Sequence, residues 1–164
     1  LVLDHTYKNR PICFFCRRQT PAALITLPQL DFLRLSGSSD ADVSGFRTDS
    51  FTALVSGASD ITVAGSYKNL SLGLSGSSNA VISGSAQTLE IKASGASSID
   101  SSDCDAQDVN IEASGATNAL IKASKHLESN LSGASDLKYY GSPQITVIRQ
   151  SGSSTIESQE IEQE

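Results

Sequence analysis

Two cysteines stand three positions apart in the segment CFFC, at Cys13 and Cys16. Two thiols at this spacing can form a reactive disulfide or supply half of a tetrahedral zinc site. Zinc needs four ligands, and the other candidates are His5, Cys104 and His126, with no second paired motif. A thioredoxin-like redox site would need a βαβ context, which the sequence lacks. We therefore expect unpaired or incidentally paired thiols, and the role of each cysteine stays open.

Serine is the second candidate for chemistry, because a serine precedes a glycine at seven positions that are spaced 18 to 20 residues apart. They are Ser36, Ser56, Ser75, Ser94, Ser114, Ser132 and Ser151. A catalytic serine needs a base and an oxyanion hole at one place. The chain has 2 histidines, and neither lies in an arrangement with a unique serine and aspartate. Seven near-identical serines therefore indicate a structural role.

Carboxylates offer a third kind of chemistry. Glu90, Glu112 and Glu128 share an expected outward face, with Lys92 and Lys122 nearby. Paired carboxylates on such a face would suit cleavage of polysaccharides. A mixed, solvated sheet surface is the simpler interpretation.

Two aspartates at equivalent places, Asp40 and Asp60, raise the possibility of a calcium site. The same offset carries Asn79, Ser98 and Asn118 elsewhere, and no G-G-x-G-x-D spacing occurs. Asp and Asn at this offset are typical turn residues. We predict no catalytic, cofactor-binding or metal-binding residue in this chain.

The Ser-Gly pairs define a repeat with steps of 18 to 20 residues. Around each pair, apolar residues alternate with polar ones, which is typical of a strand with one buried face. Three positions before the serine stand Leu33, Ala53, Leu72, Ile91, Ile111 and Ile148. Beyond the glycine the apolar members include Ile61, Val63, Ala80, Ile82, Ala119, Ile121, Leu137 and Tyr139. Each copy thus predicts two strands joined at a glycine corner.

A second corner is expected nine residues after the serine, at Gly45, Gly65, Gly84 and Gly141. A unit this small cannot bury its own apolar face, but stacked units can. The sequence therefore predicts an all-β fold: a right-handed, single-stranded parallel β-helix, or β-solenoid, of about seven coils. We assign residues 27–158 to the solenoid, 1–26 to a non-repeat N-terminal segment and 159–164 to an acidic tail.

Charge and composition disfavour some classes of binding partner. The formal net charge is -6. Residues 1–30 carry four basic residues and one acidic residue, a local charge of +3, so residues 31–164 carry -9 and nucleic acid is disfavoured. No run approaches the length of a membrane span. The chain starts at Leu1 with no signal peptide, and whether an export signal precedes it stays open.

The phrases LRLSGSSD, LVSGASDITVAG, LEIKASGAS and SGASDLKYYGSPQI resemble the auto-transporter adhesin domain family, also called the head GIN domain. The resemblance runs from about Thr26 to Ile156, and YYGSP is its most specific part. It implies a right-handed β-helix in bacterial envelope proteins, at the cell surface, in the periplasm, at the outer membrane or secreted. That family carries no assigned catalytic residues. Residues 1–26 do not resemble the strands that the family places before the solenoid.

The leading hypothesis is a non-enzymatic, envelope-associated module that presents repeated polar side chains to a glycan or protein ligand. The alternative is a carbohydrate-active enzyme, a polysaccharide lyase or hydrolase, on the same scaffold. A face of Ser, Thr and Ala could also bind an ordered lattice such as ice, although the Asp and Asn neighbours disfavour this. Self-association through the exposed strand edges of the end coils is a further possibility.

Overall fold

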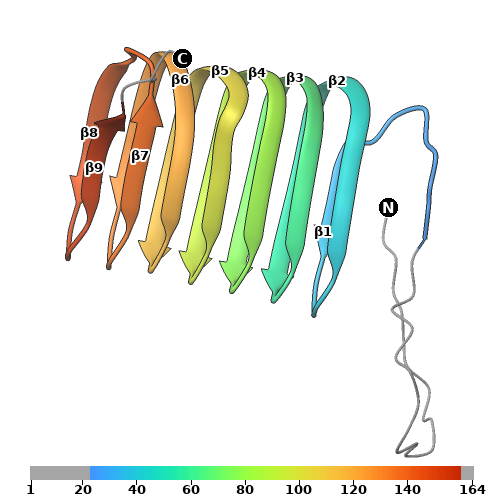
Figure 1. Cartoon of the computed structure of the whole chain (residues 1–164), viewed down its shortest axis with the longest axis horizontal. Coiled ribbons are helices and arrows are strands. Elements are labelled where there is room, and N and C mark those ends of the chain that lie inside the picture. The colour runs from blue at the N-terminus through green and yellow to red at the C-terminus, as the bar shows by residue number, and fades with distance from the viewer. Residues whose placement is uncertain (1–22, 160–164) are drawn as a thin grey trace, which may run out of the picture.

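The computed structural model describes residues 23–159, and every regular element in that range is a β-strand (Figure 1). The strands are β1 (Phe32–Leu35), β2 (Asp40–Gly57), β3 (Asp60–Gly76), β4 (Asn79–Gly95), β5 (Ser98–Gly115), β6 (Asn118–Leu131), β7 (Asp136–Tyr140), β8 (Gln144–Gln150) and β9 (Thr155–Gln159). No helix long and apolar enough to cross a membrane occurs among these residues.

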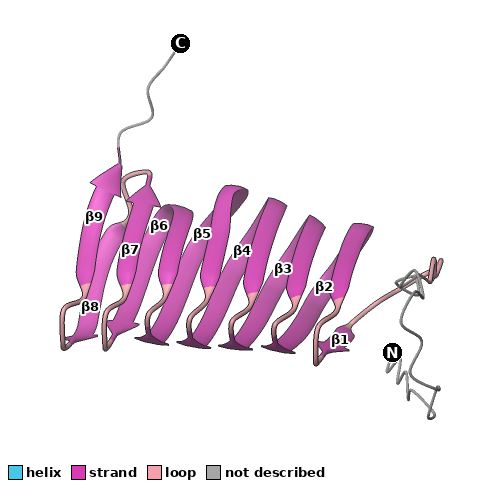
Figure 2. Cartoon of the chain, turned by 60° about the horizontal axis from the view of Figure 1, so that its bottom comes forward, coloured by secondary structure: helices cyan, strands magenta, loops and turns pink. Residues whose placement is uncertain are grey.

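All strand pairings are parallel, in the order β1-β2-β3-β4-β5-β6-β7-β9, and β8 pairs with β6. Each strand lies directly over its counterpart in the preceding winding. Figure 2 shows the short loops that follow the successive strands gathered along one edge. This arrangement confirms the predicted all-β solenoid.

The interior consists of columns of equivalent residues from successive windings. Leu72 of β3 pairs with Ile91 of β4, which pairs with Ile111 of β5. All three side chains are at most 1% exposed. The apolar residues expected to face inward thus form continuous files, because parallel in-register pairing places each one over its equivalent.

Glycine makes the corner that each winding turns. The seven glycines of the Ser-Gly pairs all have positive φ: Gly37, Gly57, Gly76, Gly95, Gly115, Gly133 and Gly152. Space matters as much as conformation. A Cβ on Gly115 would lie 2.5 Å from the carbonyl oxygen of Gly95 in the winding before. Only glycine meets both demands, which explains why the pair recurs.

A file of buried hydroxyls accompanies this corner, three residues after each Ser-Gly serine. Thr117 Oγ1 donates a hydrogen bond to the Ser114 carbonyl at 3.3 Å, and Ser135 Oγ donates to the Ser132 carbonyl at 2.8 Å. The same bond recurs at Ser39, Ser59, Ser78, Ser97 and Ser154. This file was not predicted, although its members stand at a constant offset from the serine in the sequence.

The glycines of the second corner meet the prediction in two ways. Gly45, Gly84 and Gly141 have positive φ, whereas Gly65 does not but has no room for a Cβ, which would lie 2.6 Å from the Phe46 carbonyl oxygen. In the next winding Asp103 stands nine residues after Ser94, but Cys104 pairs with Gly84, because the register shifts between Val81 and Ser83. The strands also continue through this bend, so β2 to β5 are single strands of 17 or 18 residues.

The expected inward column needs a correction at its C-terminal end. In β8 the register shifts, so Val147 rather than Ile148 pairs with Ser129. Ser129 therefore occupies the column position after Ile111, and its side chain is fully buried. The assigned domain boundaries stay predictions, although strand β9 extends to Gln159, one residue into the expected acidic tail.

Candidate functional site

A surface groove crosses the outward face of the windings just before the glycine corners. It has a volume of about 580 Å³, which lies within the range typical of ligand sites. Its outward column, two positions before each Ser-Gly serine, consists of Arg34, Leu54, Gly73, Lys92, Glu112 and Asn130. We call this feature the axial groove, since it runs across the strands that Figure 2 shows side by side.

The groove is hollow because one residue of the column has no side chain. Gly73 stands between Leu54 and Lys92 in the strand register. A Cβ on Gly73 would lie 2.7 Å from Leu54 Cδ2, so the leucine leans over the gap. Leu54 is nonetheless 39% exposed. The result is an apolar patch set beside a hollow on a polar face.

A row of serine hydroxyls forms one side of the groove. Ser56, Ser75, Ser94, Ser114 and Ser132 all line it. Four of these hydroxyls donate to a backbone carbonyl of the preceding winding, at 3.2 to 3.5 Å. A hydroxyl that donates its proton keeps acceptor lone pairs. The Ser-Gly serines, considered first as nucleophiles, thus stabilise the stack and leave oxygen acceptors at its surface.

Charge is distributed unevenly along the groove. Lys92 Nζ lies 3.0 Å from Glu90 Oε1 and 4.0 Å from Glu112 Oε2. The hydrogen bond to Glu90 and the charges of both glutamates raise the pKa of Lys92. Within residues 23–159, no ion pair involves Arg34 at the β1 end of the groove. Its guanidinium is the groove's uncompensated cation.

The predicted outward carboxylates do lie together. Glu90 and Glu128 flank Asn110 in one column, beside the column that holds Glu112. Of the residues that line the axial groove, Glu112 is the single carboxylate. Lys122 was expected nearby, but it lies beyond the glycine corner, where its Nζ is 2.7 Å from Asp105 Oδ1. That placement corrects the expectation, because the residue follows rather than precedes the turn.

The other ligand-type residues do not join in a site. Cys104 is buried, and burial together with the charge of Asp105 raises the pKa of its thiol to about 11. His126 is exposed, with Nδ1 2.6 Å from Asp108 Oδ1. No cluster of three or more metal-ligating side chains occurs within the described residues. Cys13, Cys16 and His5 lie outside the described range.

The Asp and Asn row after each glycine corner behaves as a hydrogen-bonded turn row. Asp40 pairs with Asp60 in the register, and Asn79 Nδ2 donates to Asp60 Oδ1 at 2.8 Å. At the C-terminal end, Thr155 Oγ1 donates to Asp136 Oδ1 at 2.6 Å. These residues are exposed and link adjacent windings.

Comparison with known families identifies the chain. The family model described as "putative auto-transporter adhesin, head GIN domain" matches residues 14–143. The chain belongs to this family. The match begins inside the N-terminal segment that we expected not to resemble the family, and it ends before the last windings. A search of curated proteins gives no match.

Proposed function

We propose that this head GIN domain is a non-enzymatic, adhesin-type binding module of the bacterial cell envelope that holds its ligand in the axial groove. The observation that carries the proposal is the groove itself, about 580 Å³ in volume and lined by residues of several successive windings. Family membership supports an adhesin-like role.

The geometry of the groove suits binding through repeated contacts. Equivalent side chains recur in register from one winding to the next, as in the pairs Leu54 to Gly73 and Lys92 to Glu112. Adjacent parallel strands are about 4.8 Å apart. A ligand lying across the windings would therefore meet a new set of contacts at each one, and weak contacts would add up.

The enzyme alternative receives less support. Both retaining and inverting glycoside hydrolases use two carboxyl groups across the cleaved bond. Glu112 is the single carboxylate among the described residues that line the groove, and Lys92 lies between it and Glu90. We therefore favour binding without turnover.

A binding screen tests this proposal. The full chain would be applied to an array that carries glycans and extracellular-matrix proteins, alongside the variants Leu54→Asp and Val81→Asp. Both residues point outward, with exposures of 39% and 48%, but Val81 lies on the face beyond the glycine corner and outside the groove. We expect Leu54→Asp to lose the captured ligand and Val81→Asp to retain it. Equal loss in both variants, or no capture by the unaltered chain, would refute the proposal.

A further inference from the structure

We infer, building on the proposed function, that the axial groove takes a linear glycan with equatorial linkages that carries a carboxylate at one end. The glycan would lie across the windings, with a carboxylate at Arg34 and a sugar face on Leu54. Three features of the groove lead to this ligand class: its repeat distance, its hydrogen-bonding groups and its charge.

The repeat distance favours a sugar chain over a peptide. The lining side chains recur once per winding, so their spacing is that of parallel strands, about 4.8 Å. An extended pyranose chain with equatorial linkages advances by a comparable distance per sugar. An extended peptide advances only about 3.3 Å per residue, so its side chains would soon fall out of step with the windings.

Strand addition by a peptide is also blocked along most of the groove. A peptide that binds by strand addition needs an unpaired sheet edge. Strands β2 to β5, which carry Leu54, Gly73, Lys92 and Glu112, are paired on both sides. The groove crosses these strands, so a ligand in it meets side chains rather than free backbone groups.

The hydrogen-bonding groups match those of a sugar. The serine row offers oxygen acceptors, because most of its hydroxyls already donate to backbone carbonyls. Asn130 and Lys92 add donors on the other side of the groove. Leu54, leaning over Gly73, offers an apolar surface for the C–H face of a pyranose ring. Sugar hydroxyls both donate and accept, and so can use both sides.

The charged side chains of the groove indicate where a carboxylate of the ligand would bind. Lys92 pairs with two glutamates, Glu90 and Glu112, so this cluster carries a formal net charge of -1, whereas Arg34 has no ion-pair partner among residues 23–159. Arginine binds carboxylates through two parallel hydrogen bonds. A uronic acid at the β1 end of the groove would supply the missing partner.

A chain-length series tests the inference. Isothermal titration calorimetry with the full chain would use β-1,4-linked glucose oligosaccharides of two to ten sugars that carry a single glucuronic acid at one end. Neutral cello-oligosaccharides of equal length would be the comparison. We expect affinity to rise with each added sugar up to about six, one for each residue of the outward column, and then to level off. The acidic series should bind more tightly, and added salt should reduce that advantage.

Two variants separate the groove from the rest of the surface. Gly73→Gln should reduce affinity for both series about tenfold by filling the hollow. Gly73 does not have positive φ, and the nearest obstacle to a side chain is the flexible end of Leu54, so the fold should tolerate the change. Arg34→Gln should cost about threefold for the acidic series alone, as expected for one exposed ion pair. Val81→Gln is the matched control, and unchanged circular dichroism would verify folding of each variant.

The outcomes are distinguishable from those of the proposed function. Affinity independent of chain length, or unaffected by Gly73→Gln in a folded protein, overturns the glycan inference. The array could instead capture a matrix protein in a way that depends on Leu54, while the oligosaccharides do not bind. That result would support the proposed binding module and refute the inference that its ligand is a glycan. If the chain binds neither an array ligand nor the oligosaccharides, both the proposed function and the glycan inference are refuted.

Discussion

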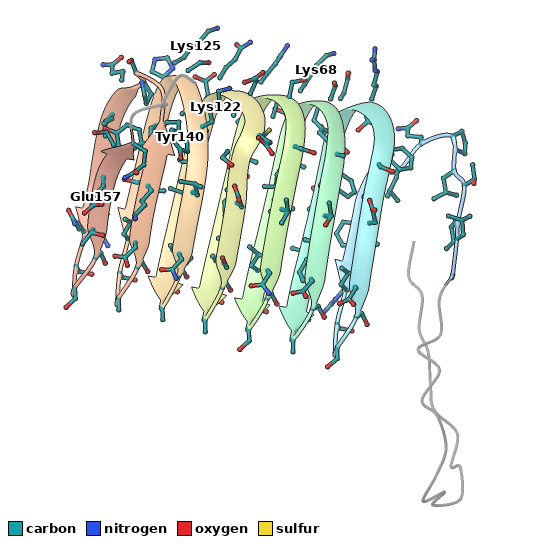
Figure 3. The ribbon with its side chains drawn as sticks, viewed as in Figure 1. Lys68, Lys122, Lys125, Tyr140 and Glu157 are labelled. Carbon is teal, nitrogen blue, oxygen red and sulfur yellow. The ribbon has the colours of Figure 1, made fainter. Side chains whose placement is uncertain are left out.

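The two edges of each winding turn the chain by different means. At the glycine corner, the same backbone conformation and the same hydroxyl-to-carbonyl hydrogen bond recur in all seven copies. At the opposite edge, where the strands bend, Figure 3 shows Lys68 and Lys125 projecting into solvent. Windings at this bend are linked by exposed side-chain pairs, such as Lys68 with Asp49 at 2.8 Å and His126 with Asp108 at 2.6 Å.

The difference shows where the repeat tolerates variation. Successive Ser-Gly pairs are 18 to 20 residues apart, so some windings carry an extra residue. Among the pairings of β2 to β6, every register shift lies at the bend or within a few residues of it, at Ser44, Val81, Ser101 and Ala106. The glycine corner stays fixed because its backbone leaves no room for change, and the bend absorbs the surplus length.

The largest expected effect comes from blocking the glycine corner. Gly115→Val places a β-branched residue at a φ of +92°, with its Cβ against the Gly95 carbonyl. We expect a loss of about 3 kcal/mol or more in the free energy of unfolding, measured with urea. Lys92→Val, at an exposed outward position of the adjoining winding, is the control. Similar small losses in both variants would contradict the assigned role of the corner.

A smaller loss should follow from removing one hydroxyl of the buried file. Thr117→Val keeps the shape of the side chain but deletes the bond to the Ser114 carbonyl. We expect about 1 kcal/mol of destabilisation, because the carbonyl loses a partner in a buried setting. Urea unfolding at constant m-value measures it, and an unchanged midpoint would mean that the file only fills space.

Removing a buried hydroxyl that lies outside that file should stabilise the protein rather than destabilise it. Ser129 Oγ is buried without a hydrogen-bond partner in the column that otherwise holds Ile111 and Ile91. Ser129→Ala should raise the free energy of unfolding by about 1 kcal/mol, since an unpaired buried polar group is removed. Thermal unfolding would report a higher midpoint. A decrease would mean that the hydroxyl contributes a favourable interaction in the folded protein.

The smallest effect is expected at the bend. Lys68→Ala removes an ion pair whose two side chains are 57% and 78% exposed. Such pairs contribute little in water, so the change in unfolding free energy should stay within about 0.5 kcal/mol. A loss as large as that of Thr117→Val would show that the ion pairs hold the bend as firmly as the hydroxyls hold the corner.

The sequence predicts those features of the fold that depend on backbone conformation and close backbone packing. The Ser-Gly corner and the inward file through Leu72, Ile91 and Ile111 were readable because positive φ and close stacking demand particular residue types. The bend was predicted less well, since side-chain pairs and bulges can serve there with many residues. The sequence has Asp103 rather than glycine nine residues after Ser94, and the register places Cys104 opposite Gly84.

The axial groove was not predicted, although its elements were visible in the sequence. Strand alternation places Leu54, Gly73 and Lys92 outward at one offset. An apolar residue next to a glycine on an otherwise polar face was the available signal. It was missed because a hollow depends on how far Leu54 leans over Gly73, and a pattern of residue types does not specify that distance.

The most direct test of the account compares the two outward faces of the same folded protein. Binding to the captured array ligand would be measured by surface plasmon resonance for the unaltered chain, Leu54→Asp and Val81→Asp. We predict that Leu54→Asp weakens binding at least tenfold, about 1.4 kcal/mol, while Val81→Asp leaves it unchanged. Loss of binding in Val81→Asp with Leu54→Asp unaffected would contradict the account, because the ligand would then lie on the face beyond the glycine corner.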